Sequence, residues 1–404
     1  MRSKGVITRM DEWLRFFKKV FIRTILLPLR MLPVKSNRLL LINDLARKYS
    51  GNPKYIAEYL CEKYPGKFEI IFTLSAPDTY KDQIPPEVRP VRINSAKYFY
   101  FAMTAKVLIT NSGGFSYLPL RKSQHVLNTW HGGGAYKKCG TDMYNCSNLF
   151  KRDLRLSANK TTAFLSTNQR FTKVISKSML IPENVFWEIG MPRNDFLIQN
   201  NQESRSCIRH KLGLSDGEKL VLFAPTYRKP HDNYFKESIA ISCGIDVARV
   251  CAALKKRFGG DWKCAFRLHP RVINRQEYIP EGTLDLSDYE DMQELLLAAD
   301  VLINDFSSSF WDFMLTGKPG FLFATDLQHY IETTEVYTPV SEWPFPKSTN
   351  NDELEHNILS FDEKKYREDC KSHYEALGGC ETGKAAQLVC EWVYNKCFPK
   401  NADV

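Results

Sequence analysis

The chain has 404 residues, of which 43% are hydrophobic and 25% are charged, a composition typical of a globular protein with room for two domains. Its formal net charge is +10, but residues 1–40 carry ten Lys/Arg and two Asp/Glu, so +8 belongs to that segment and +2 to the rest. This distribution argues against nucleic acid as a partner, and the eleven cysteines form no C-x-x-C pair, which argues against a zinc ribbon and favours a reduced environment.

The first segment is a basic arm with interleaved aromatic side chains. Trp13, Phe16, Phe17 and Phe21 alternate with Lys and Arg, and no uncharged run approaches the roughly 20 residues that span a bilayer. The order of charges and apolar residues is not that of a signal peptide. The pattern predicts an amphipathic helix whose residues 1–32 lie on an anionic membrane surface. The alternative is a helix that packs on the body or on a partner protein.

Short apolar runs alternate with helical patterns through the body of the chain. The first set of expected strands covers 38–43, 68–74, 105–110, 125–129, 163–166 and 185–189, and the expected helices among them are 55–64 and 98–104. After the polar stretch 200–206, a second set has strands at 220–223, 262–267, 301–303 and 321–324, and helices at 247–258, 291–299 and 310–315. Residues 362–397 are expected to be mostly helical. This alternation predicts two Rossmann-like domains with parallel sheets, facing each other across a cleft.

Polar clusters follow four of the expected strands, where parallel sheets bind their ligands. These clusters contain His131 with Gly132 and Gly133, Thr226 with Arg228, Arg267 with His269 and Arg271, and Asp305 with Ser307, Ser308 and Ser309. Histidine is suited to general-base catalysis at neutral pH, and arginine to phosphate oxygens. A single histidine is more often structural, but two at strand ends in different halves of the chain indicate function.

The stretch 301–315 reads as a strand, a polar turn with three serines, and the start of a helix. Free N–H groups and hydroxyls at such a helix start favour a phosphate. The alternative is simple capping of the helix by Ser307 or Ser308. No metal site is expected, because Asp285, Asp288 and Asp291 are spaced like a solvated acidic turn and no P-loop is present.

Six short motifs occur in one order between residues 38 and 394. They are Trp130-His131-Gly132 with Lys137 or Lys138, Gly190-Met191-Pro192-Arg193-Asn194-Asp195, Ala224-Pro225-Thr226-Tyr227-Arg228, Arg267-Leu268-His269-Pro270, Asn304-Asp305-Phe306-Ser307-Ser308, and Asp312-Phe313 with Gly317-Lys318-Pro319. Together they resemble the CDP-glycerol glycerophosphotransferase family, the teichoic acid primases and polymerases, which is also found in capsule synthesis. The loop after His131 is one residue longer than the commoner family form, which leaves the acceptor and the polyol open.

The resemblance implies an α/β, GT-B-like fold that transfers a polyol phosphate from a CDP-activated donor to a hydroxyl of a membrane-linked or glycan acceptor and releases CMP. The expected domains are a membrane-associating arm (1–35), an acceptor domain (36–205), a CDP-donor domain (206–385) and a C-terminal helix and tail (386–404). The expected partners are CDP-glycerol, or alternatively CDP-ribitol, a lipid-linked or glycan acceptor, and the cytoplasmic face of the membrane. No cofactor is expected, and dependence on a divalent metal is left open.

The resemblance also assigns roles to individual residues. It implies that His131 is the general base, that His269 acts at the donor phosphate, and that Ser307, Ser308 and Ser309 bind phosphate, with Arg228 and Arg267 near the pyrophosphate. Residues expected to support the site are Gly132, Gly133, Lys137, Asn194, Asp195, Thr226, Asp305 and Asp312. Two other functions remain as alternatives: a GT-B glycosyltransferase that uses a nucleotide sugar, and a non-catalytic binding protein of a polysaccharide assembly complex.

Overall fold

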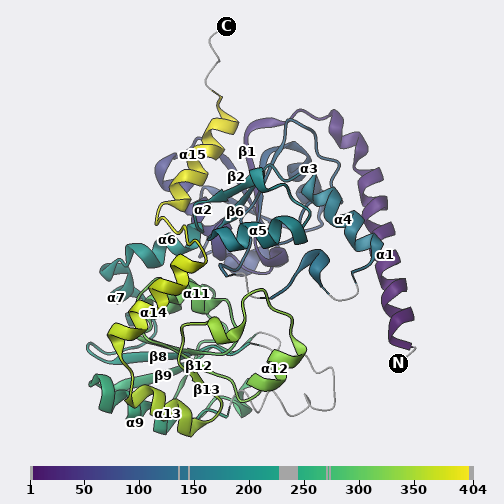
Figure 1. Cartoon of the computed structure of the whole chain (residues 1–404). Coiled ribbons are helices and arrows are strands. Elements are labelled where there is room, and N and C mark those ends of the chain that lie inside the picture. Colours follow the sequence, from purple (N-terminus) through teal and green to yellow (C-terminus); the bar gives the residue numbers. More distant parts are fainter. Residues whose placement is uncertain are drawn as a thin grey trace. The chain divides into compact units, whose positions relative to one another are not determined.

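The computed structural model describes residues 3–134, 137–143, 146–226, 244–269, 272 and 274–399, with side chains from residue 12 onward (Figure 1). Its contacts divide the chain into two compact units, Met1–Asp195 with Cys380–Val404 and Phe196–Gly379. The sequence placed the division at 205/206. Residues from 196 onward belong to the second unit, where helix α7 (Gln202–Lys211) packs on helix α10 (Met292–Ala298).

The first unit contains a parallel sheet of seven strands in the order β3-β2-β1-β4-β5-β6-β7. At its centre, Leu40 pairs with Ile71 on one side and Leu108 on the other. The expected strands are present, and a further edge strand, β3, contains Pro90. An edge position tolerates proline because one side of the strand makes no ladder hydrogen bonds. The strands are β1 (Lys35–Ile42), β2 (Glu69–Leu74), β3 (Val88–Arg92), β4 (Ala105–Thr110), β5 (His125–Asn128), β6 (Ala163–Ser166) and β7 (Phe186–Glu188).

Helices cover both faces of this sheet, which is why its central strands are apolar on both sides. Leu39 and Leu41 of β1 face a core that includes α2 and α15, whereas Leu40 and Ile42 face a core that includes α3 and Leu26. The helices of this unit are α1 (Ser3–Ile25), α2 (Gly51–Lys63), α3 (Ala96–Thr104), α4 (Asn148–Ala158), α5 (Gln169–Ser178), α6 (Pro192–Gln199, which continues into the second unit) and α15 (Ala385–Cys397). Short 3₁₀ helices are η1 (Leu27–Met31), η2 (Asp44–Ala46), η3 (Pro77–Tyr80), η4 (Gly140–Asp142) and η5 (Glu183–Val185).

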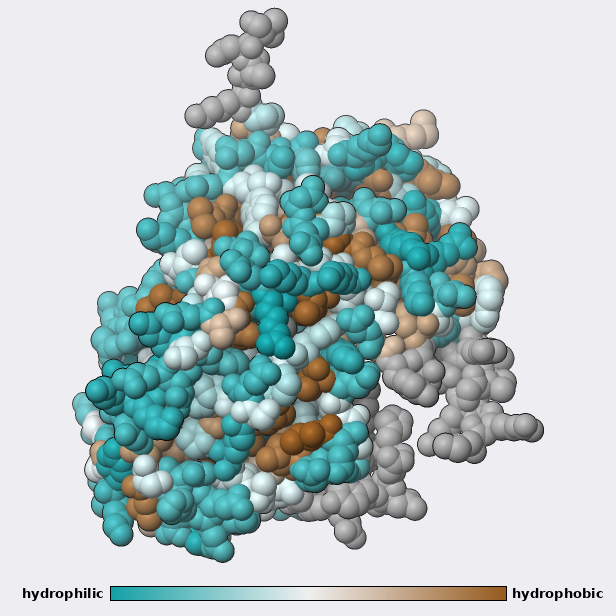
Figure 2. Space-filling model, viewed as in Figure 1, coloured by the Kyte–Doolittle hydropathy of each residue, from teal (hydrophilic) through white to brown (hydrophobic). Residues whose placement is uncertain are grey.

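Helix α1 has apolar side chains on two faces. On its inner face, Ile22 packs against the core, and Lys19 forms an ion pair with Asp153 of α4 at 2.6 Å. On its outer face, Trp13, Phe17 and Phe21 are exposed. In the view of Figure 2, most of the molecular surface is hydrophilic and apolar residues form small separate patches. None of the helices in the described part of the chain is long and apolar enough to span a bilayer.

The second unit repeats the topology with six parallel strands in the order β10-β9-β8-β11-β12-β13. Its strands are β8 (Lys219–Phe223), β9 (Trp262–Phe266), β10 (Leu284–Asp285), β11 (Val301–Asn304), β12 (Gly320–Phe323) and β13 (Lys347–Ser348). Besides α7 and α10, its helices are α9 (Val247–Phe258), α11 (Ser309–Met314), α12 (Leu327–Thr333), α13 (Asn351–Leu359), α14 (Glu363–Ala376), η7 (Arg275–Glu277) and η8 (Val340–Glu342). The α/β class with two parallel sheets is therefore confirmed.

The strand order reverses direction at one place in each sheet. In the first unit this switch point lies between β1 and β4, and in the second unit between β8 and β11. The crevice beyond the carboxyl ends of strands at a switch point is the usual ligand site of such sheets. The residues that follow these four strands are therefore the first candidates for a functional site.

The C-terminal segment is anchored to the first unit by the motif at 190–195. The carboxylate of Asp195 accepts hydrogen bonds from the N–H groups of Ala385 at 3.0 Å and Ala386 at 2.7 Å, at the start of α15. Glu381 accepts from the Asn194 amide at 2.7 Å and from the Met191 N–H at 3.0 Å. Asn194 and Asp195 thus hold α15 in place.

We expect Asp195→Ala to lower the free energy of unfolding by about 2 kcal/mol, because two N–H groups at a helix start lose a buried acceptor. Chemical denaturation followed by circular dichroism measures this change. The control is Asp78→Ala, which removes an exposed aspartate paired with Lys81 and should leave stability unchanged. Equal stability of the two variants would contradict the anchoring role.

Candidate functional site

Two asparagines connect the central strands of the first unit where these strands end. Asn111 follows β4 and Asn43 follows β1. The Asn111 amide donates to the side-chain oxygen of Asn43, and its own oxygen accepts from the N–H of Asp44 at 2.8 Å. Asn111 is only 5% exposed. The switch point is thus bridged by neutral amide groups, and both the amide nitrogen and the oxygen of the Asn111 side chain take part in that bridge.

The main-chain carbonyl of Asn111 orients His131. The Nδ1 atom of His131 lies 2.8 Å from this carbonyl oxygen. Because a carbonyl only accepts hydrogen bonds, Nδ1 carries the proton, and in the neutral ring the lone pair lies on Nε2. Trp130, in a left-handed conformation with φ of 53°, stacks on the ring with centroids 4.6 Å apart. The residue is open to solvent on one side, although its ring lies among many protein atoms.

The electrostatic surroundings favour the neutral form of His131. Loss of hydration among the surrounding protein atoms lowers its pKa, and the positive charge of Arg193 acts in the same direction. The hydrogen bond to Asn111 and the charge of Asp44 oppose this effect, but the net result is a pKa below the usual value. A neutral imidazole with a free Nε2 lone pair is the form that a general base requires.

Asn52, on α2, holds the backbone that carries His131. Its amide donates to the carbonyls of Thr129 at 3.1 Å and Trp130 at 3.2 Å. Its oxygen accepts from the N–H of Arg193 at 3.1 Å. The guanidinium of Arg193 in turn donates to the carbonyl of His131 at 3.1 Å. Asn52 is 1% exposed, so these bonds form away from water, where losing them is costly.

The glycines after His131 lie close to the end of β6. The carbonyl of Gly133 accepts from the side chains of Asn168, at 3.0 Å, and Thr167. Gly132 is buried and Lys137 is exposed. The loop after His131 is therefore anchored at Gly133.

Asp305 connects the central strands of the second unit in the same way as the two asparagines do in the first. It follows β11 and is fully buried. Its carboxylate accepts from the N–H of Thr226 at 2.9 and 3.1 Å and from the Thr226 hydroxyl at 2.9 Å. Thr226 lies beyond the end of β8, so these bonds bridge the second switch point. Asp305 and Thr226 therefore fix the backbone at the ends of β11 and β8, where the candidate site lies.

The three serines after Asp305 differ in their surroundings. Ser309 is buried, accepts from the Asn304 amide at 2.6 Å and donates to the Ser307 hydroxyl oxygen at 3.0 Å. The Ser307 hydroxyl oxygen also accepts a hydrogen bond from the N–H of Ser309 at 3.3 Å. This bond is of the capping kind that the sequence analysis gave as the alternative to phosphate binding. Ser308 forms no side-chain capping bond. Ser307 and Ser308 are half-buried and so within reach of a ligand, whereas Ser309 stabilises the turn.

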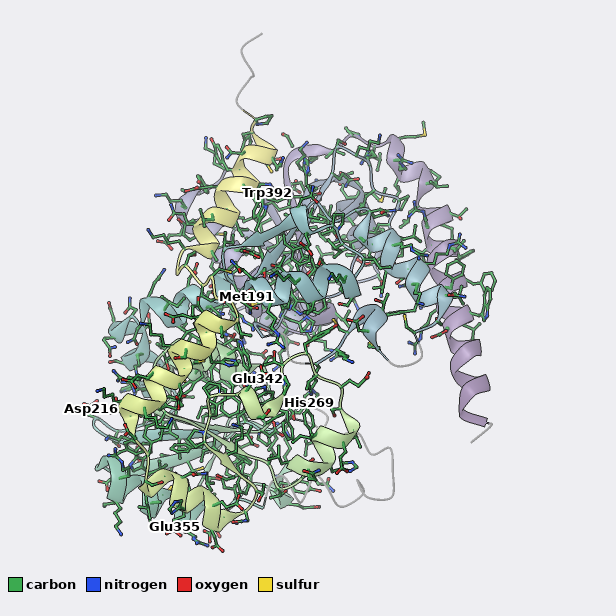
Figure 3. The ribbon with its side chains drawn as sticks, viewed as in Figure 1. Met191, Asp216, His269, Glu342, Glu355 and Trp392 are labelled. Atoms are coloured by element: carbon green, nitrogen blue, oxygen red, sulfur yellow. The ribbon has the colours of Figure 1, made fainter. Side chains whose placement is uncertain are left out.

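Arg267 and His269 follow β9, and Figure 3 labels His269 in the second unit. His269 is half-buried, and the preceding N–H, of Leu268, donates to the Ser287 hydroxyl at 3.0 Å. The guanidinium of Arg267 donates to the Tyr289 carbonyl at 3.2 Å and contacts the sulfur of Met292 at 3.0 Å. Burial lowers the pKa of Arg267, while Asp291 and Glu290 oppose that shift.

Other predicted residues are structural or lie outside the described part of the chain. Asp312 accepts from the Gln293 amide at 2.8 Å, which joins α11 to α10. Lys318 donates to the carbonyls of Leu297 and Ala299 at 2.8 and 2.7 Å, and burial lowers its pKa to about 7. Arg228 and Arg271 lie outside the described residues. Within the described residues, no three His, Cys, Asp or Glu side chains are grouped to hold a metal ion.

The sequence prediction did not include Asn43, Asn52, Asn111 or Arg193 among the site residues. Asn43 ends one predicted strand and Asn111 directly follows another, so their position carried a usable signal. Arg193 belongs to the motif from which only Asn194 and Asp195 were chosen. Asn52 had no signal, because its bonds to the His131 backbone connect distant parts of the chain.

Several known proteins are similar to this chain. Residues 26–395 match the family model described as CDP-Glycerol:Poly(glycerophosphate) glycerophosphotransferase. The teichoic acid poly(glycerol phosphate) polymerase of Bacillus spizizenii is 28% identical over 407 residues, covering 97% of this chain and 99% of that protein. The protein of the same name from Staphylococcus epidermidis is 28% identical over 364 residues, which is 86% of this chain but only 49% of that longer protein.

A solved structure of the wall teichoic acid polymerase TagF has a TM-score of 0.79 to this chain at 25% identity, covering 97% of this chain and 98% of that one. This match confirms the GT-B-like fold that the sequence predicted.

We expect Asn52→Ala to lower the free energy of unfolding by about 3 kcal/mol, because two buried carbonyls and one N–H lose their partner. If Asn52 positions His131, the titration of the His131 ring followed by NMR will also shift. The matched control is Asn37→Ala, an exposed asparagine whose amide contacts the Lys67 carbonyl at 3.4 Å. An unchanged His131 titration in Asn52→Ala would limit this residue to a role in stability.

Proposed function

The chain belongs to the CDP-glycerol:poly(glycerophosphate) glycerophosphotransferase family, and on that premise we propose that it transfers glycerol phosphate from CDP-glycerol to a hydroxyl of a teichoic acid-type acceptor. The observation that carries the proposal is the geometry of His131, a neutral histidine with its Nδ1 proton fixed on the Asn111 carbonyl. Glycerol is favoured over ribitol because two relatives at 28% identity bear the name teichoic acid poly(glycerol phosphate) polymerase.

The reaction is a direct displacement at phosphorus. Nε2 of His131 takes the proton of the acceptor hydroxyl, and the oxygen attacks the β-phosphorus of CDP-glycerol, which bears the glycerol. The bond from the β-phosphorus to the oxygen that bridges to the α-phosphorus breaks, and CMP leaves with that oxygen. The products are a phosphodiester and CMP, so atoms and charge balance without a further reactant. No cofactor takes part in this scheme.

The donor side of the reaction belongs to the second unit. We assign the donor phosphates to Ser307, Ser308 and His269, which are half-buried residues after β11 and β9. Hydroxyl and imidazole N–H groups held on a rigid backbone stabilise the charge that develops as CMP leaves. Arg228 stays a prediction. The guanidinium of Arg267 donates to the Tyr289 carbonyl, and its role near the pyrophosphate stays a prediction as well.

The acceptor is attached to a membrane lipid in this proposal, and helix α1 brings the enzyme to the membrane surface. Phe17 and Phe21 on its outer face are 58% and 65% exposed, and Trp13 lies beside them. Arg15 and Lys18 add positive charge to the same helix. Exposed aromatic side chains combined with basic ones are typical of helices that lie in the interface of an anionic membrane. The enzyme is then peripheral, on the cytoplasmic face.

We expect His131→Gln to lower the rate of CMP release from CDP-glycerol by roughly 100-fold or more, since a positioned general base contributes at least that factor. In the wild type, the acid limb of the pH–rate profile should have its midpoint below the usual histidine pKa of about 6.5, because the lowered pKa of His131 keeps its base form at lower pH. CMP release is measured by chromatography, and product analysis separates a phosphodiester from the glycosidic bond of a sugar transferase.

The matched control for this experiment is His125→Gln. His125 lies at the start of β5, on the strand that leads to His131, and burial lowers its pKa to about 4. This variant should retain most of the activity. Full activity of His131→Gln, or the same loss in both variants, would refute the general-base assignment.

We expect Phe17→Ser/Phe21→Ser to weaken binding to anionic vesicles roughly 30-fold, because each phenyl ring that enters the membrane interface contributes about 1 kcal/mol. Vesicle co-sedimentation measures the change. The control is Met143→Ser/Ile331→Ser, which removes two exposed apolar side chains elsewhere on the molecule. If both double variants bind vesicles as the wild type does, α1 is not the membrane-binding element.

A further inference from the structure

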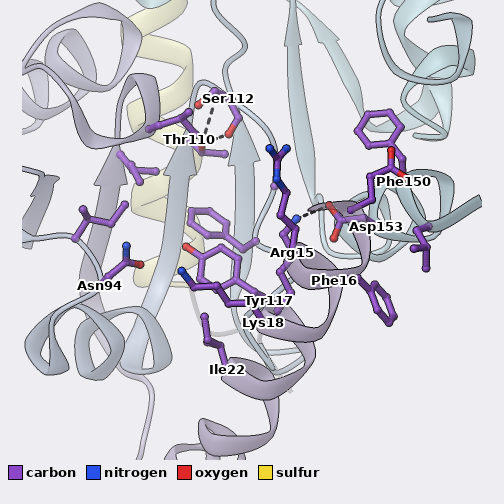
Figure 4. Close-up of a pocket in the computed structure, with 18 residues that line it drawn as sticks. Arg15, Phe16, Lys18, Ile22, Asn94, Thr110, Ser112, Tyr117, Phe150 and Asp153 are labelled. Carbon is purple, nitrogen blue, oxygen red and sulfur yellow. Dashed lines mark hydrogen bonds and ion pairs between the residues drawn. The ribbon is translucent and has the colours of Figure 1, made fainter. Parts of the chain in front are cut away.

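A pocket of about 500 Å3 lies within the first unit, between the inner face of α1 and the ends of three sheet strands, β1, β3 and β4 (Figure 4). Its apolar wall is formed by Phe16, Ile22, Ile42, Ile93, Phe115 and Leu149. These residues come from α1, from the ends of β1 and β3, from the loop after β4 and from the start of α4. A volume of this size is that of a small-molecule site.

Charged side chains of α1 line the same pocket. Arg15, Lys18, Lys19 and Glu12 come from the helix, and Asp153 comes from α4. Lys19 is paired with Asp153. Arg15 and Lys18 form no ion pair or hydrogen bond with the side chains that the structure describes. The pocket therefore has two cations, Arg15 and Lys18, that form no such bond, and one carboxylate, Glu12, besides the paired Asp153. This excess of positive charge beside an apolar wall matches a ligand with an anionic head and an apolar chain.

The far side of the pocket is the loop that orients His131. Thr110 and Ser112 line the pocket at the end of β4, and between them in the chain is Asn111, whose carbonyl accepts from the His131 ring. The Thr110 hydroxyl donates to the Ser112 carbonyl at 2.9 Å, which keeps this turn compact. A molecule in the pocket therefore touches the segment that positions the proposed base.

The outer face of the helix that covers the pocket is the apolar face with Phe17 and Phe21. A lipid leaving the pocket beside α1 reaches a membrane bound to that face. An ordinary bilayer phospholipid has no chemical reason to contact the segment that orients the general base, whereas an acceptor does. The position of the pocket thus favours a substrate over a structural lipid.

We propose that this pocket binds the lipid-phosphate end of the acceptor: its phosphate between Arg15 and Lys18, and the first part of its apolar chain against Phe16, Ile22 and Phe115. The identification of this ligand as an acceptor rests on the proposed function, but its binding requires no turnover. The remaining chain stays in the membrane, because 500 Å3 accommodates only a head group and a short length of chain.

The binding test uses dodecyl phosphate, below its micelle concentration, titrated into the full chain by calorimetry. Two variants change the pocket in independent ways: Leu149→Trp fills it from the half-exposed start of α4, and Arg15→Gln/Lys18→Gln removes the two cations other than the paired Lys19. Each should weaken binding about tenfold or more, because one variant removes charged hydrogen-bond donors to the phosphate and the other fills the space of the apolar chain. Dodecyl maltoside, with the same chain and a neutral head, should bind the wild type more weakly than dodecyl phosphate.

The control variant is Phe17→Ser/Phe21→Ser, which changes the outer face of the same helix and should bind dodecyl phosphate as the wild type does. Equal affinity of the wild type and both pocket variants would overturn the proposal, and so would an equal loss in the outer-face variant, which would show adsorption on α1. Thermal melting checks that Leu149→Trp is folded. If it is not, the exposed Arg15→Gln/Lys18→Gln variant decides alone.

Two further experiments distinguish a bilayer lipid from the acceptor, and failure of this proposal from failure of the proposed function. Vesicles of phosphatidylglycerol test a bilayer lipid: if Leu149→Trp weakens vesicle binding as much as dodecyl phosphate binding, the pocket holds a bilayer lipid and the acceptor assignment is overturned. In turnover assays, Leu149→Trp should raise the KM for a lipid-phosphate acceptor and leave the KM for CDP-glycerol unchanged. If the wild type releases no CMP but dodecyl phosphate binds as expected, the proposed function fails while the lipid-phosphate site is supported.

Discussion

The hydrogen bond between the His131 ring and the Asn111 carbonyl joins the end of β5 to the end of β4, and the chemistry of the first unit depends on it. Parallel strands bring their carboxyl ends to one edge of a sheet, so residues distant in the chain meet there. The bond selects the tautomer of the ring. It works only because the side chain of Asn111 is held at Asn43 and Asp44, which fixes the direction of the carbonyl.

In each unit a buried side chain bridges the ends of the two strands at the switch point, but the charge of that side chain differs. Asp305, a carboxylate, bridges the switch point of the second unit, whereas Asn111 and Asn43, which are neutral, bridge that of the first. A buried carboxylate in place of Asn111 would lie next to His131 and raise its pKa, so that the ring would be protonated over more of the physiological range. Neutral bridging groups, together with Arg193, keep the proposed base uncharged.

The fold was largely readable from the sequence, and the contacts within the site were not. Central strands such as β4 and β11 are buried on both faces, so they appear as apolar runs, and His131 and Ser307 stand out because they follow such runs. The edge strand β3 was missed because Pro90 interrupts its pattern. Asn194 and Asp195 were assigned to the site, but their bonds to Glu381 and the start of α15 involve residues nearly 190 positions later, which spacing cannot reveal.

The return of α15 to the first unit affects the order in which the protein matures. Val389 and Val393 of this helix complete the core that contains Leu39 and Leu41 of β1. During synthesis, the ribosome delivers these valines only after all of the second unit, and domains generally fold as they emerge. The second unit can therefore fold before the first unit is complete, because the core of the first unit stays uncovered until α15 has been made. The core of the unit that carries the proposed base is therefore completed only near the end of translation, after the whole second unit has been made.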